Sequence, residues 1–126
     1  MKLNHECVRT LLLEIESNKK MGEHLTKYNF ENNIVFEIYD FETVMYTLLK
    51  LKEAEFLNCS ITWSSDKPQI YMIGDITWSG HEFLDNIRDN KTWSEVKNVV
   101  SKTSSMSITL MSKLAFQYMT QKFNLS

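Results

Sequence analysis

The fold is decided by the stretch Ile76-Thr-Trp-Ser-Gly-His-Glu-Phe-Leu-Asp-Asn-Ile-Arg88, where an extended segment gives way to a helix within a few residues. Ser79 and Glu82 have the spacing of a capping box, in which each side chain accepts a hydrogen bond from the other residue's backbone amide. Gly80 has no Cβ, so we expect the start of the helix to press closely against the layer beneath it. We therefore predict strands and mixed elements before this junction and helices after it.

Composition describes an ordinary globular protein. The chain has 126 residues, 43% of them hydrophobic, with one proline and three glycines, which predicts a single domain over residues 1–126. The formal net charge of -2 argues against a strongly basic nucleic-acid binder and against an acidic mimic of nucleic acid. Cys7 and Cys59 lack CxxC spacing and no apolar run approaches a membrane span, so we expect a soluble, cytoplasmic protein with reduced thiols.

The first forty residues suggest a helix and a strand. Asn4 is a plausible N-cap for a helix that ends near Ser17, and residues 25–30 could form a short helical turn. Residues 34–39 alternate in the period-two pattern of a strand with one buried face. We predict that this strand ends at Asp40.

Residues 41–76 contain the clearest helix of the front half and a hairpin. Asp40 is a good N-cap for a helix over residues 41–56, which has one apolar face. Residues 59–64 and 69–73 favour extended structure, and Ser65-Asp-Lys-Pro68 between them has turn chemistry. We therefore predict a β-hairpin after this helix.

Residues 76–126 suggest two to three helices. The junction helix should end near Asn90, and Thr92 and Glu95 repeat the capping-box spacing at the start of the next helix. A serine-rich turn at residues 101–107 precedes a final helix over residues 107–123. The apolar residues of this last helix are too many for one stripe, which indicates a second buried surface.

The predicted fold class is α+β and mainly helical. Residues 1–75 follow the order helix, strand, helix, β-hairpin, which is close to a winged helix, and helices in residues 76–126 follow it. In that fold the helix over residues 41–56 is the recognition helix and the hairpin is the wing. Many winged-helix proteins have glycine where Glu55 stands.

Two stretches together resemble a known family. They are Met1-Lys-Leu-Asn-His-Glu-Cys-Val-Arg9 and Asp75-Ile-Thr-Trp-Ser-Gly-His-Glu-Phe-Leu-Asp-Asn-Ile-Arg-Asp89. They are similar to domain-of-unknown-function family 2513, uncharacterised small phage and prophage proteins of Gram-positive bacteria. The resemblance implies a phage or prophage origin and a location in the host cytoplasm. It carries no established activity, so it assigns no functional residues.

No arrangement of residues predicts catalysis. His81, Asp85 and Asp89 share a helix face and could supply metal ligands, but the sequence identifies no second ligand cluster, and a polar outer face has the same pattern. His5, Glu6 and Cys7 could be read as a nucleophile site, but they are more simply one helix turn with Cys7 as a small core residue. Nucleophile elbows, phosphate-binding glycine loops and zinc spacings do not occur in the sequence. We predict a protein that is not an enzyme and has neither a metal nor a cofactor.

The first functional hypothesis is DNA binding through the helix over residues 41–56 and the hairpin. Its candidate contacts with phosphates and base edges are Thr43, Tyr46, Thr47, Lys50, Lys52 and Lys67. Asp40 and Glu42 would face phosphates unfavourably, and no arginine lies between Arg9 and Arg88 to read guanine. This hypothesis therefore requires a positive face on these elements.

The second hypothesis is an adaptor or inhibitor that binds a host protein, such as a defence component, through an exposed apolar or acidic face. The two-sided last helix also suggests a homodimer. The candidate interface residues are Leu110, Phe116, Met119 and Phe123. The alternative is that this helix is sandwiched inside the monomer.

Overall fold

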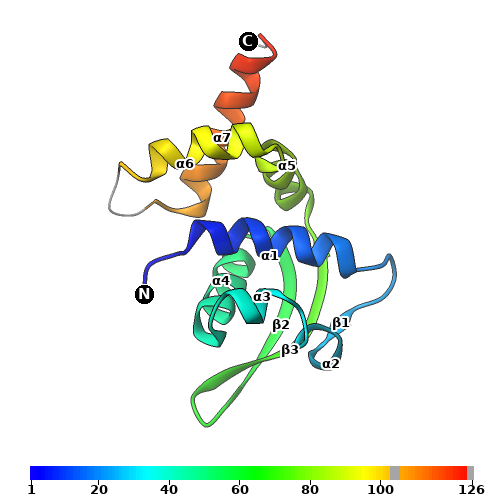
Figure 1. Ribbon diagram of the computed structural model, residues 1–126. Coiled ribbons are helices and arrows are strands. Elements are labelled where there is room, and N and C mark those ends of the chain that lie inside the picture. Colours follow the sequence, from blue (N-terminus) through cyan, green and yellow to red (C-terminus); the bar gives the residue numbers. More distant parts are fainter. Residues whose placement is uncertain (103–105, 125–126) are drawn as a thin grey trace.

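The protein is described by a computed structural model, which covers residues 1–102 and 106–124 (Figure 1). It is an α+β structure and mainly helical, as predicted. The elements in chain order are α1 (His5–Asn18), β1 (Leu25–Thr26), α2 (Lys27–Phe30), α3 (Val35–Ile38), α4 (Phe41–Glu53), β2 (Leu57–Ser64), β3 (Lys67–Ile76), α5 (Trp78–Ile87), α6 (Asn90–Val100) and α7 (Ile108–Lys122).

Helix α1 runs through the middle of the molecule (Figure 1). On one side of it lie α3, α4 and the sheet, and on the other lie α5, α6 and α7. Its buried side chains are Cys7, Val8, Leu11, Leu12 and Ile15. One cluster of buried residues includes side chains from α1 through α7, so the front and back halves share a hydrophobic core.

The strands form one antiparallel sheet in the order β1-β3-β2 within the described residues. The predicted hairpin is confirmed and is longer than expected, because β2 and β3 pair from Leu57 opposite Ile76 to Ser64 opposite Lys67. Between Ser64 and Lys67, Ser65 and Asp66 have φ values of 51° and 63°. Positive φ at both central residues is typical of the type I′ turn that matches the twist of two-residue hairpins.

The strand predicted at residues 34–39 is wrong, because α3 occupies this segment. The amides of Ile38 and Tyr39 donate to the carbonyl oxygens of Ile34 and Val35, and the side chain of Asn33 accepts from the amide of Val35. Six residues of alternating pattern are too few to separate a strand from a helical turn, and the asparagine before them favours local capping. The first strand is instead β1, which is paired with Met72 and Ile73 of β3, and the short helix expected near residues 25–30 is α2.

The N-cap of helix α5 lies two residues before the predicted cap, Ser79. The N-cap is Thr77, whose hydroxyl accepts from the amide of Gly80 at 3.1 Å and donates to the carbonyl oxygen of Glu55 at 2.6 Å. Ser79 is exposed on the first turn, so the predicted Ser79–Glu82 box is wrong. The threonine forms the cap because its hydroxyl also satisfies a carbonyl on the segment between α4 and β2.

The close approach predicted at Gly80 is confirmed. A Cβ placed on Gly80 would lie 2.7 Å from Cγ2 of Ile76 and would overlap the carbonyl oxygen of Phe56. The same carbonyl oxygen accepts a hydrogen bond from the amide of Thr77 at 3.0 Å. Glycine is therefore required at this position, because the first turn of α5 packs directly on the backbone of Phe56, just before β2.

The caps of the last two helices differ in how well the sequence predicted them. Helix α6 is capped by Asp89, which accepts from the amide of Thr92, so the predicted Thr92 cap is wrong. Helix α7 begins where it was predicted, and its N-cap is Ser107, whose hydroxyl accepts from the amide of Leu110. The predicted serine-rich turn lies partly outside the described residues, at 103–105.

Candidate functional site

Helix α4 has a buried face and an outer face. Its buried residues are Val44, Met45, Thr47, Leu48 and Leu51. Thr47 is 0% exposed and its hydroxyl donates to the carbonyl oxygen of Thr43 at 2.8 Å, so the prediction that Thr47 contacts DNA is wrong. The sequence reading failed here because threonine is short and polar and fits either face of a helix.

The outer face of α4 carries Glu42, Tyr46, Lys50 and Glu53, one helical turn apart from one another. The ammonium of Lys50 lies 2.9 Å from a carboxylate oxygen of Glu53 and 5.3 Å from the centre of the Tyr46 ring. The hydrogen bond with Glu53 raises the pKa of Lys50, so this lysine is charged at neutral pH and already paired. The phenol of Tyr46 donates to the carbonyl oxygen of Met1 at 3.1 Å.

A groove of about 540 Å³ runs along this outer face. One wall is the N-terminal segment, residues 1–3, and the other is the start of α7 with Met106 and Ser107. Its lining residues are Met1, Lys2, Leu3, Tyr46, Lys50, Glu53, Ala54, Met106, Ser107, Ile108 and Thr109. Most of these are apolar or uncharged, and two are flexible methionine side chains that adapt to different partners. We call this feature the α4 groove.

The structure brings only some of the predicted DNA contacts together. Tyr46 and Lys50 share the α4 groove, whereas Lys52 lines a separate hollow of about 440 Å³ with His24 and Cys59. Lys67 lies opposite Ser64 at the tip of the hairpin, which projects from the body of the molecule (Figure 1). The lysines therefore do not form one continuous stripe.

The charge of this region is negative. Residues 40–76, which include α4 and the hairpin, contain three lysines and no other basic side chain. They contain six carboxylates, at Asp40, Glu42, Glu53, Glu55, Asp66 and Asp75. Asp40 caps α4 and its hydrogen bonds from Thr43 lower the pKa of its carboxyl group, so it is ionised at neutral pH. The positive face that the DNA hypothesis requires does not occur on these elements in the described structure.

The residues considered for metal binding have structural partners. Asp85 pairs with Arg88 at 2.9 Å, and Asp89 caps α6, where the hydrogen bonds from Thr92 lower the pKa of the Asp89 carboxyl group. His81 lies 3.9 Å from Glu16, a residue that Arg88 also binds. In the part of the chain that the structure covers, no group of three or more His, Cys, Asp or Glu side chains is arranged to hold a metal ion.

Both thiols are shielded from solvent, Cys7 completely and Cys59 in part. Cys7 is fully buried in the core between α1 and its neighbours, as the core interpretation expected, and burial raises the pKa of its thiol. Cys59 is half-buried on β2, and burial also raises the pKa of that thiol. Neither thiol is activated toward nucleophilic chemistry by these surroundings.

Helix α7 has one face in the core and exposed apolar side chains elsewhere. Ile108, Met111 and Ala115 are buried against α5 and α6. Of the predicted interface residues, the exposed ones are Leu110 (52%), Phe116 (57%) and Phe123 (60%). Phe116 and Phe123 are two helical turns apart on one flank, and Leu110 lies about 120° away around the helix. Met119 is partly buried, and its sulfur accepts from the hydroxyl of Thr92 at 3.8 Å.

The α4 groove could not be found from the sequence. Its walls come from residues 1–3, α4 and residues 106–109, which are far apart along the chain. The Tyr46–Met1 hydrogen bond spans 45 residues and involves a backbone carbonyl, which no side-chain motif marks. The only local signal is the polar outer face of α4, which by itself is typical of solvent exposure.

The fold defines an α+β protein, and the α4 groove is its candidate site. The chain belongs to the family described as "Hypothetical protein (DUF2513)", whose model matches residues 2–107. It is similar to an uncharacterized protein of Haemophilus influenzae (strain ATCC 51907 / DSM 11121 / KW20 / Rd), with 30% identity over 116 residues, which are 91% of this chain and 92% of that protein. No solved structure shows a significant match to the chain. The resemblance to the family is thus confirmed, and the match ends just before α7.

Within the described residues, no helix combines the length and the apolar character needed to cross a membrane.

Proposed function

We propose that this protein is a non-enzymatic regulatory protein that binds another protein through the α4 groove. The observation that carries the proposal is that the outer face of α4 forms the floor of a groove whose walls include Met1, Leu3, Met106 and Ile108. The lysine of this face, Lys50, is neutralised by Glu53. Grooves of this kind accept an amphipathic helix or an extended segment of a partner. The methionines at positions 1 and 106 would let the walls adjust to the partner's side chains.

The scaffold in this proposal is winged-helix-like. The order α1, β1, α2, α3, α4 and the β2–β3 hairpin, with sheet order β1-β3-β2, supports it, because α3 supplies a helix between the first strand and α4. Helix α4 then has the position of the recognition helix, and the hairpin has the position of the wing. Glu55 has a φ of 63°, the left-handed conformation that explains why glycine is common at this place in such folds.

The charge pattern favours a protein partner over DNA. A phosphate backbone approaching α4 would meet Asp40 and Glu42 at the helix start, and Lys50 would have to leave Glu53 to contact it. Binding to DNA depends on several basic side chains that release counterions from phosphates. With six carboxylates and three lysines over residues 40–76, this region repels phosphates overall.

The proposal includes the biological setting suggested by the family resemblance. The protein would be encoded by a phage or prophage of Gram-positive bacteria and would act in the cytoplasm of the host. Its partner would be a host factor, such as a defence component. We also propose that the protein acts as a homodimer whose contact lies on α7, since Phe116 and Phe123 are exposed there.

DNA binding is the second candidate, and one observation favours it. The order of elements places α4 directly before a projecting hairpin, as in DNA-binding winged helices (Figure 1). The hairpin exposes Trp63 (60%) and carries Lys67 near its tip. Both side chains could approach a DNA backbone or groove.

A site-specific photo-crosslinker tests the groove directly. Replacing Tyr46 by p-benzoylphenylalanine in bacterial cells should give a crosslink to one protein of distinct mass. The same substitution at Ser94, exposed on α6 and outside the groove, should not. Equal crosslinking from both positions, or crosslinking from Tyr46 only to DNA, would contradict the proposal.

A further inference from the structure

We infer that a second copy of this chain docks on the groove between α5 and α7, so that Glu82 of each copy pairs with Lys113 of the other. The inference rests on the proposed homodimer and specifies its contact surface. It concerns a different face from the α4 groove. We call it the α5–α7 groove.

The α5–α7 groove has a volume of about 650 Å³. Helix α5 contributes Ser79, Glu82 and Asn86, which lie on one helical face because they are spaced by three and four residues. Helix α7 supplies the opposite wall, and the segment between α4 and β2 contributes Ala54 and Phe56. A helix of a second copy could lie along such a trough.

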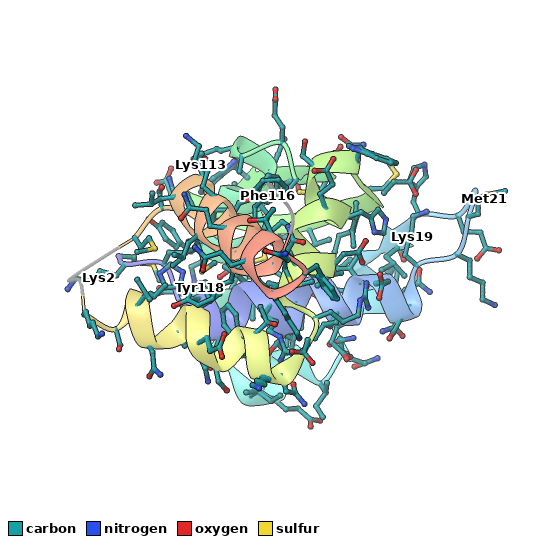
Figure 2. All side chains as sticks on the ribbon, turned by 90° about the horizontal axis from the view of Figure 1, so that it is seen from above. Lys2, Lys19, Met21, Lys113, Phe116 and Tyr118 are labelled. Carbon is teal, nitrogen blue, oxygen red and sulfur yellow. The ribbon has the colours of Figure 1, made fainter. Side chains whose placement is uncertain are left out.

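An apolar edge borders this groove. Phe116 lines it and is 57% exposed, and Phe123 is 60% exposed two turns further along the same flank of α7. The later part of α7 projects beyond α5 and α6 (Figure 1), and from above Phe116 lies on the opposite side of α7 from Tyr118, which faces α6 (Figure 2). Two exposed aromatic rings on a projecting helix are a typical anchor for association.

The charges of the groove are complementary to themselves, which favours a second copy over a different partner. Glu82 and Lys113 are both exposed, and neither forms an ion pair with any residue that the structure describes. In a two-fold symmetric interface the same patch is used by both copies, so the acid of one copy meets the base of the other, twice. Glu82 and Lys113 of each copy would thus each gain an oppositely charged partner.

A charge-reversal cycle tests the inference by sedimentation equilibrium at low and moderate salt. The wild-type protein should be a dimer. Glu82→Lys and Lys113→Glu should each raise the dissociation constant of the dimer about tenfold, because each variant places like charges opposite each other at both symmetry-related contacts. The double variant should have a dissociation constant within about threefold of the wild-type value, since it re-forms both ion pairs with the charges exchanged. Lys67→Glu, at the hairpin tip, is the matched control and should leave the dimer unchanged.

The outcomes separate this inference from the proposals on which it depends. A wild-type monomer at high protein concentration would overturn both the homodimer and the contact proposed for it. A dimer that tolerates both single reversals, or that the double variant does not restore, would overturn the α5–α7 contact and leave a homodimer through another surface. Circular dichroism of each variant confirms the fold, and crosslinking from Tyr46 reports separately on the α4 groove.

Discussion

Replacing Gly80 by alanine should destabilise the protein by about 3 kcal/mol, mainly through steric overlap at the start of α5. The added methyl group would overlap the carbonyl oxygen of Phe56 and would lie 2.7 Å from Cγ2 of Ile76. One of these contacts is backbone, so a change of rotamer cannot relieve it. Helix α5 would have to move away from the segment between α4 and β2.

The magnitude follows from what that movement disturbs. Forcing an extra methyl group into a packed interface costs about 2 kcal/mol. Displacing α5 would also weaken the hydrogen bonds of the Thr77 amide to Phe56 and of the Thr77 hydroxyl to Glu55, each contributing about 1 kcal/mol. Alanine recovers about 1 kcal/mol because it favours the helix more than glycine does. The net change is a loss of about 3 kcal/mol.

The assay is urea denaturation followed by circular dichroism and tryptophan fluorescence. The control is Ser79→Ala, which changes an exposed neighbour on the same helical turn and should alter the free energy of unfolding by less than about 0.5 kcal/mol. If Gly80→Ala were as stable as wild type, the close contact between α5 and Phe56 would not exist in solution. A large loss of stability in Ser79→Ala would instead support the Ser79–Glu82 capping box that the sequence suggested.

Three further predictions concern capping, backbone conformation and pH. Thr77→Ala should cost about 1–2 kcal/mol in urea denaturation, since it removes the cap of α5 and the bond to Glu55, and a neutral result would contradict Thr77 as the cap. Glu55→Gly should stabilise the protein by about 1 kcal/mol because the φ of Glu55 is 63°. The control Glu53→Gly, in the last turn of α4, should destabilise it by a similar amount. A loss of stability in Glu55→Gly would show that the backbone of Glu55 is not strained. Burial lowers the pKa of His5, so the unfolded chain binds a proton more readily than the folded one, and stability should fall as the pH drops below about 6.5. His5→Gln should reduce this dependence of the melting temperature on pH, measured by thermal unfolding. If the melting temperature of the variant fell as steeply with pH as that of the wild type, His5 would not be the source.

Local signals predicted the elements that local interactions determine. Asp40 caps α4, Ser107 caps α7 and the Ser65-Asp66 turn closes the hairpin, each through contacts within a few residues. Gly80 was also predictable, because a glycine in the first turn of a helix next to a strand usually marks close backbone contact. The two caps and the turn depend only on neighbouring residues, whereas Gly80 predicted a close contact without indicating that its partner is Phe56.

The errors arose where distant segments compete with local preference. Residues 34–39 alternate like a strand, but the sheet takes Leu25 and Thr26 as the partners of β3, and Val35–Ile38 form α3. Thr77 replaces Ser79 as the cap of α5 because the carbonyl of Glu55, 22 residues earlier, accepts its hydroxyl proton. Such partners are not visible in the sequence around the helix.

The candidate site was predictable only in part. The outer position of Tyr46 and Lys50 follows from the helical period of α4, and both line the α4 groove. The groove itself depends on residues 1–3 and 106–109, and their proximity to α4 results from the path of the whole chain. The sequence therefore indicated the helix that forms the floor of the α4 groove but not the groove itself.

We propose that the outer face of α4 binds protein and not DNA. The most direct measurement is fluorescence anisotropy of a labelled duplex, including random sequence and DNA flanking the gene, titrated with the protein at low and moderate salt. We predict no saturable binding even at low salt, because the α4 and hairpin region carries more carboxylates than lysines. Saturable binding that weakens steeply with salt and is lost in Lys50→Ala and Lys67→Ala would contradict this account and assign the hairpin and α4 to DNA.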